Sequence, residues 1–140
     1  TPEIARRELR ELGRRLDLSS TQVVEDRTSL GPGNAVVVEI ESEHVTEVFT
    51  GFGEKRVSAE RVAMLVGDEA KAYLESGAPV GEHLADQLLL PLALAGAGAF
   101  VTAELSTHAT TNMEVIRMFL GTRFPVLRNG QLTRVEIELR

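Results

Sequence analysis

Two spacings of hydrophobic residues alternate along the 140-residue chain and divide it into expected helices and strands. In residues 2–16, apolar side chains recur every three or four positions, which predicts a helix with one buried stripe. Valine-rich runs at 35–42 and 44–51 are separated by a short polar stretch, which favours an antiparallel hairpin. Residues 21–28 predict another short strand. Up to residue 53, the pattern therefore predicts one helix followed by three strands.

After residue 53 the spacing predicts helices at 58–76 and 81–98, a strand at 99–105, a helix at 110–121 and a hairpin at 123–139. Ser58 is placed to cap the first of these helices, and Pro91 should kink the second or interrupt its hydrogen bonds. The pair Asn129-Gly130 is the strongest turn signal of the chain. We therefore expect an α+β fold with helices on one face of a mixed sheet.

The charge of the chain limits what it can bind through a broad surface. The net charge is -6 at pH 7, which gives no support to a protein that binds nucleic acid through a wide basic face. Five arginines near the start alternate with glutamates at helical spacing, which favours a solvated, ion-paired helix face over a nucleic-acid patch. They are Arg6, Arg7, Arg10, Arg14 and Arg15.

The composition also indicates in which cellular compartment the protein lies. There is no cysteine, which excludes disulfides and thiolate metal sites. The longest apolar run, at 88–101, is short, rich in glycine and alanine and interrupted by a proline, so we expect no membrane span. The chain opens on a charged amphipathic segment without an apolar leader, and the missing initial methionine suggests a trimmed or internal start. We expect a cytoplasmic protein.

His108 lies between an expected strand and an expected helix. Thr111 and Glu114 form the T-x-x-E pattern of a capping box, which would start the helix just after the histidine. Free amides at such a helix start would then point back toward the imidazole and could hold a phosphate. A neutral imidazole there could act as ligand, base or nucleophile. The residues alone favour a turn histidine that bonds a backbone carbonyl over a catalytic one.

His83, Asp86 and Gln87 are polar residues in an otherwise apolar expected helix. Buried polar groups need partners, which a ligand can supply, but a helix start at the surface would explain His83 and Asp86 equally well. A metal site built from His83, Asp86 and His108 is a weaker alternative. His44, at the tip of the expected hairpin, is most simply a solvated turn residue.

Three stretches of the chain resemble one known family: "GPGNAVVVEIESEHVTEVFTGFGEKRVSAERVA", "VGEHLADQLLLPLALAGAGAF" and "STHATTNMEVIRMFL". Their most specific pieces are G-E-x-L-A-D-Q-L at 81–88 and the H-x-x-T-N element of His108, Thr111 and Asn112. The chain resembles, in register over nearly its whole length, the C-terminal part of bacterial RNA 3'-terminal phosphate cyclases. The resemblance implies several repeats of a βαβαββ unit with a small thioredoxin-like insert. Residues 1–53 would be most of the insert, incomplete at its start, and 54–140 the last catalytic repeat.

The resemblance also implies a reaction and a set of site residues. Such cyclases consume ATP to convert an RNA 3'-phosphate into a 2',3'-cyclic phosphate through a covalent AMP-histidine intermediate, and the nucleophile corresponds to His108. Asp86 and Gln87 correspond to residues that face the ATP or AMP pocket. His83 stands where many bacterial members have a tyrosine stacked on adenine. Two aromatic residues before the G-E-K-R sequence are candidates for a contact with the base: Phe49 and Phe52.

The implied partners are RNA 3'-phosphate ends, ATP and a divalent ion, Mg or Mn. The family's N-terminal repeats are expected outside this chain, and so are the ligands of that ion. We assign no metal ligand to the chain itself and expect it to be inactive alone. A non-catalytic cyclase-like module of RNA binding or ribosome assembly is the alternative, although retention of His108 argues for the active branch. A small-molecule binding domain with His83 and Asp86 in its pocket is a further possibility.

Overall fold

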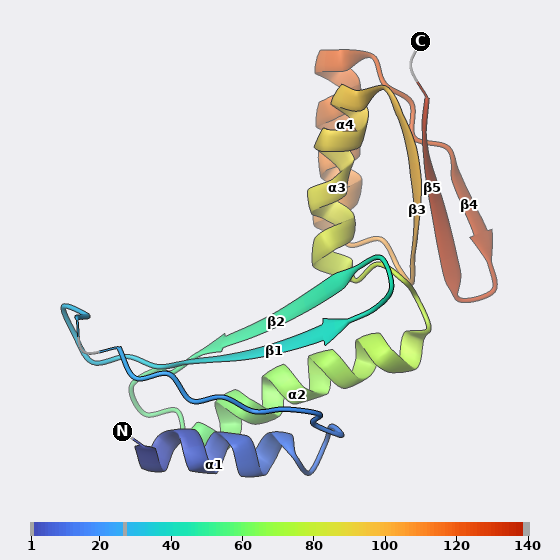
Figure 1. The fold of residues 1–140 in the computed structure, drawn as a ribbon. Coiled ribbons are helices and arrows are strands. Elements are labelled where there is room, and N and C mark those ends of the chain that lie inside the picture. The colour runs from blue at the N-terminus through green and yellow to red at the C-terminus, as the bar shows by residue number, and fades with distance from the viewer. Residues whose placement is uncertain (1, 27, 139–140) are drawn as a thin grey trace. The chain divides into compact units, whose positions relative to one another are not determined.

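A computed structural model describes residues 2–26 and 28–138 of the chain. The fold is α+β, as expected from the sequence, with two small sheets (Figure 1). The chain packs into two compact units, one formed by Thr1–Ser42 and Val48–Ala72 and the other by Glu43–Glu47 and Tyr73–Arg140. The domain boundary expected near residue 53 concerns the repeats of the resembling family and stays a prediction.

The first unit contains helix α1 (Pro2–Leu12), strand β1 (Ala35–Glu41) and most of strand β2 (Thr46–Phe52) and helix α2 (Ala59–Ser76). β1 and β2 form a two-stranded sheet and run in opposite directions, which confirms the predicted hairpin (Figure 1). The predicted first helix is also confirmed, although it ends at Leu12 instead of residue 16. Three buried side chains of its core come from different elements: Leu12, Val36 and Val66.

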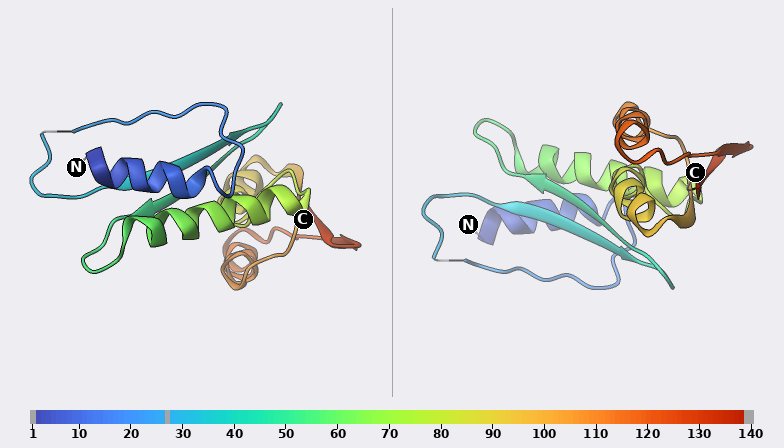
Figure 2. Two further views of the ribbon diagram at one scale, coloured as in Figure 1. Left: turned by 90° about the horizontal axis from the view of Figure 1, so that it is seen from below. Right: turned by 90° about the horizontal axis from the view of Figure 1, so that it is seen from above.

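α2 lies close against β2 because a glycine faces it. A Cβ on Gly51 would come within 2.5 Å of Val66 and 3.1 Å of Val62, so a larger residue would push the strand from the helix. Ser58 caps α2 as predicted, since its Oγ accepts the N–H of Arg61 at 3.2 Å. α2 and α1 lie side by side in the views of Figure 2.

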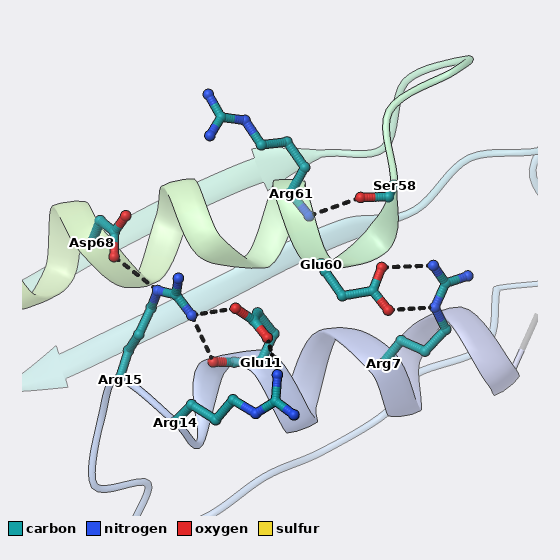
Figure 3. A network of polar contacts seen from close by, with 8 residues as sticks. All are labelled: Arg7, Glu11, Arg14, Arg15, Ser58, Glu60, Arg61 and Asp68. Atoms are coloured by element: carbon teal, nitrogen blue, oxygen red, sulfur yellow. Dashed lines mark hydrogen bonds and ion pairs between the residues drawn. The ribbon is translucent and has the colours of Figure 1, made fainter.

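Arg6, Arg14 and Arg15 form ion pairs with glutamates three or four positions away, as the sequence predicted. Two further pairs, which it did not predict, join α1 and its following turn to α2 (Figure 3). Arg7 donates from Nε and Nη2 to the two carboxylate oxygens of Glu60 at 2.7 and 2.6 Å. Arg15 donates to Asp68 at 2.8 Å. The hydrogen bond from Arg7 lowers the pKa of Glu60 to about 2. These arginines therefore serve the packing of the first unit.

The strand predicted at 21–28 is wrong for the described residues 21–26 and 28, and Arg27 lies outside them. A strand needs a partner, and β1 is paired with β2 alone in its two-stranded sheet. Val23 and Val24 remain 58% and 77% exposed. The first unit thus has two of the three expected strands.

The second unit contains helix α3 (Glu82–Ala95), strand β3 (Ala97–Thr102), helix α4 (Thr107–Leu120) and strands β4 (Val126–Asn129) and β5 (Leu132–Glu138). The strand order is β3-β5-β4, and both pairs are antiparallel. The sequence predicted a mixed sheet, but the three strands are antiparallel. Parallel pairing is present as an isolated bridge between Val80 and Thr102. α3 and α4 pack on this sheet through a shared core with Leu89, Phe100 and Val135 (Figure 1).

Local details of the second unit follow the sequence closely. Asn129 pairs with Leu132, so the predicted hairpin turns through Gly130, with a φ of 62°, and Gln131. The predicted strand end at Leu139 lies outside the described residues. α3 contains Pro91 and still continues to Ala95, although proline supplies no N–H to the helix. Among the helices of the described part, none has the length and apolar character needed to cross a membrane.

Candidate functional site

His108 belongs to the first turn of α4. The helix begins at Thr107, and Ser106 is its N-cap, with an Oγ that accepts the N–H of Ala109 at 3.1 Å. His108 is therefore the second helical residue, and its side chain is exposed. First-turn amides have no partner within a helix, so those of Thr107 and His108 are available to an anion.

The capping box predicted from Thr111 and Glu114 is wrong. Ser106 already caps the helix, so Thr111 lies inside it, and Glu114 accepts hydrogen bonds from Arg117 at 2.7 and 3.2 Å. Both Ser106 and Thr111 precede the same apolar run and could cap a helix, and the helix begins after Ser106. The imidazole consequently lies within the helix start instead of in a turn before it.

A hollow of about 450 Å³ lies beside His108. It is lined by the starts of the two helices and the segment between β3 and α4, namely Glu82, Glu104, Leu105, Ser106, Thr107 and His108. α3 and α4 run in the same direction, so both positive helix ends lie on this side of the unit (Figure 1). The carboxylates of Glu82 and Glu104 oppose that attraction for an anion. The hollow thus combines an imidazole, helix amides and two acidic groups.

Asp86 and Asn112 join α3 to α4 next to this hollow. Asn112 donates from Nδ2 to Oδ1 of Asp86 at 3.0 Å and to the carbonyl oxygen of Asp86 at 3.4 Å. Both residues are half-buried. Both residues belong to motifs that the sequence singles out, but their pairing depends on how two helices align, which no local pattern predicts. The available signal was the position of Asn112, a polar residue on the same helix face as the buried Ala109 and Ile116.

The other candidate residues are distributed differently. His83 and Gln87 are exposed on α3, within a turn of Asp86. Phe49 and Phe52 belong to the first unit and do not line the hollow; Phe49 is 6% exposed and Phe52 69%. Their nucleotide contacts stay predictions. Across residues 2–26 and 28–138, no three His, Cys, Asp or Glu side chains gather in a way that could hold a metal ion.

Glu47 is a buried residue that sequence reasoning missed. Its Oε1 accepts the N–H of Gly81 at 2.5 Å, and Gly81 is the N-cap of α3 without a side-chain cap of its own. A Cβ on Gly81 would lie 2.9 Å from the Glu47 carboxylate, so the close contact requires glycine. The negative charge at this position stabilises the positive end of α3. An acidic residue at an inward position of a valine-rich strand was the signal for this contact.

Comparisons with known proteins agree with the sequence resemblance. The family model for RNA 3'-terminal phosphate cyclase matches residues 8–126, which include the hollow, Asp86 and Asn112. The RNA 3'-terminal phosphate cyclase of Ralstonia nicotianae (strain ATCC BAA-1114 / GMI1000) is 49% identical over 138 residues. That alignment covers 97% of this chain and 40% of the relative, so the chain spans less than half of the relative's length. The chain belongs to the RNA 3'-terminal phosphate cyclase family.

Proposed function

We propose that the protein to which this chain contributes uses ATP to convert RNA 3'-phosphate ends into 2',3'-cyclic phosphates, with His108 as the nucleophile. The observation that carries the proposal is the position of His108. Its exposed imidazole lies in the first turn of α4, beside a hollow, in a chain 49% identical to a protein named for this reaction. An imidazole nitrogen lone pair and nearby helix amides are what an attack on phosphorus requires.

The proposed chemistry has three displacements. A nitrogen of His108 attacks the α-phosphorus of ATP, the bond to the bridging oxygen breaks, pyrophosphate leaves with that electron pair, and the imidazole loses its proton. An oxygen of the RNA 3'-phosphate then attacks the same phosphorus, and the bond to nitrogen breaks. Finally the 2'-hydroxyl attacks the phosphorus of the RNA 3'-phosphate, loses its proton and displaces AMP. Helix amides near His108 would stabilise the charge that develops on the α-phosphate oxygens.

The remaining assignments belong to the same proposal. Asp86, Gln87 and His83 would contact the nucleotide, with the His83 imidazole offering adenine a smaller stacking surface than a tyrosine would. Phe49 and Phe52 are further candidates for contact with the base. A divalent ion would take its ligands outside this chain, and no displacement described here passes through it.

We also propose that residues 54–140 contain the last βαβαββ repeat of the family and that residues 1–53 belong to a thioredoxin-like insert. The order of α3, β3, α4, β4 and β5 supports the repeat. The isolated parallel bridge between Val80 and Thr102 would mark its first strand. The remaining repeats would come from the part of the protein that corresponds to the unmatched 60% of the Ralstonia relative.

Transfer of labelled AMP tests the proposed nucleophile. This chain is combined with the segment of the Ralstonia relative that it does not match, and the assembly is incubated with ATP labelled at the α-phosphorus and a divalent ion. We expect a protein-bound label that acid removes and alkali spares, because a bond between phosphorus and imidazole nitrogen behaves in this way. His108→Ala should reduce the label to background.

His44→Ala is the matched control, because His44 is an exposed histidine paired with Glu43 between β1 and β2. Its label should equal that of the unchanged protein. Label that survives in His108→Ala would refute the assignment. An assembly that binds RNA with or without a 3'-phosphate and never consumes ATP would instead support a non-catalytic module.

A further inference from the structure

Asn112 holds Asp86 in one orientation. Its Nδ2 lies 3.0 Å from Oδ1 of Asp86 and 3.4 Å from the carbonyl oxygen of the same residue. Both partners are acceptors, so the amide must present its NH₂ group to them. The other carboxylate oxygen, Oδ2, accepts no hydrogen bond from any residue that the structure describes. Asp86 therefore has one oxygen fixed by protein and one open to a donor.

The alignment of the two helices relates this bond to His108. Asn112 lies four residues after His108 on α4, and Asp86 lies four residues after Glu82 on α3, so each pair shares a helix face. Glu82 and His108 line the same hollow. The bond between Asp86 and Asn112 thus lies one helical turn farther along both helices from that hollow.

We propose that Asn112 is a positioning residue of the nucleotide pocket, which holds the Asp86 carboxylate so that Oδ2 accepts a hydrogen bond from a hydroxyl or amino group of ATP. This inference rests on the proposed function. An asparagine suits the task because a neutral NH₂ group orients the carboxylate without neutralising it. An alanine would release the Asp86 side chain, and an aspartate would set two carboxylates against each other.

The test is a double-mutant cycle in the assembled protein. The dissociation constant for ATP is measured for the unchanged protein, Asn112→Ala, Asp86→Ala and the double variant, together with KM and kcat for AMP transfer. We expect Asn112→Ala to raise the dissociation constant and KM about tenfold, the effect of one hydrogen bond to a charged group, with kcat little changed. Asn112→Asp, which keeps the size of the side chain, should weaken ATP binding at least as much.

In the Asp86→Ala background, Asn112→Ala should have no further effect, because its target is gone. A merely structural link between the helices would instead lower the midpoint of unfolding and leave ATP affinity unchanged. That result would overturn the proposal, and so would additive losses of ATP affinity. Arg117→Ala, which breaks an exposed pair with Glu114 on the same helix, is the control and should leave ATP affinity intact.

The same measurements separate this inference from the proposed function. If ATP binds and the cycle is non-additive but no AMP is transferred, the positioning role stands and the cyclase reaction fails. If AMP is transferred and the cycle is additive, the reaction stands and the positioning role fails. An assembly that does not bind ATP at all contradicts both.

Discussion

Glu8 shows what a single buried carboxyl group does to the first unit. It is 5% exposed on α1, and Asn34 donates from Nδ2 to its Oε1 at 2.6 Å. Burial raises the pKa of Glu8, although the hydrogen bond from Asn34 acts in the opposite direction. The backbone carbonyl of Asn34 also accepts the N–H of Gly53 at 2.9 Å. Asn34 thus links Glu8 of α1, through its side chain, to the residue that follows β2, through its backbone.

The raised pKa of Glu8 predicts a pH dependence of stability. A folded-state pKa above the unfolded value of 4.5 means that the folded chain binds the proton more tightly. The associated stabilisation is complete below pH 4.5 and is lost as the pH rises through the folded-state pKa. Glu8→Gln keeps an acceptor for Asn34 and has no charge to desolvate, so it should be more stable than the unchanged chain at pH 7. Urea unfolding at pH 4 and pH 7 measures the difference, which should shrink at pH 4.

Asn34→Ala is the companion variant, since it leaves Glu8 buried without its donor. It should lower the free energy of unfolding at pH 7 by about 1 to 3 kcal/mol. In a chain that already carries Glu8→Gln, the same change should cost less, because a neutral amide loses less than a carboxylate when its donor is removed. Equal losses in both backgrounds would show that the carboxyl charge has no part in this contact.

At the scale of elements, α3 depends on an acid that it does not contain. Gly81, its N-cap, has no side chain to accept an N–H of the first turn, and the buried Glu47 of β2 instead accepts the N–H of Gly81 itself at 2.5 Å. Glu47→Ala should lower the free energy of unfolding by about 1 to 3 kcal/mol, because the Gly81 N–H loses its partner. Hydrogen exchange should accelerate at Gly81 more than in α4. Glu47→Gln, which retains an acceptor oxygen, should lose less, and an unchanged rate at Gly81 in Glu47→Ala would contradict the capping role.

The elements also show where sequence reasoning succeeds and where it stops. Three predictions that depend on neighbouring residues are confirmed. They are the start of α2 at Ser58, the turn at Asn129-Gly130 and the helix α3. The strand at 21–28 failed because strand formation depends on a distant partner, which its valines do not specify. The start of α4 was misplaced because two cap signals competed.

The candidate site divides in the same way. The resemblance to the family's H-x-x-T-N element predicted His108 as a site residue, and the structure places it in a helix start beside a hollow. The hydrogen bond between Asp86 and Asn112 could not be foreseen, because it depends on the alignment of α3 with α4 over 26 positions of sequence. The sequence could thus nominate a candidate residue but not a contact between two helices.

At the scale of the whole chain, the two compact units have their own buried residues, while β2 and α2 cross from one unit to the other. Leu89 is fully buried in the core of the second unit, where Ala85, Phe100 and Val135 belong to the same cluster. Val66, 3% exposed, has the corresponding role in the first unit. Substitutions at these two positions can therefore reveal whether the units unfold separately.

We expect the two units to unfold separately. Leu89→Ala should lower the free energy of unfolding of the second unit by about 2 to 5 kcal/mol, because it leaves a cavity at a position that is well packed. Amide hydrogen exchange should then accelerate in β3 and β5 and stay nearly unchanged in β1, since stability differs between cooperative units of one chain. Val66→Ala is the reciprocal variant and should accelerate exchange in β1 and spare β5. If either substitution accelerates exchange equally in β1 and β5, the elements that cross between the units couple them into one cooperative structure, and a disturbance near the Asp86–Asn112 bond would then be felt throughout the chain.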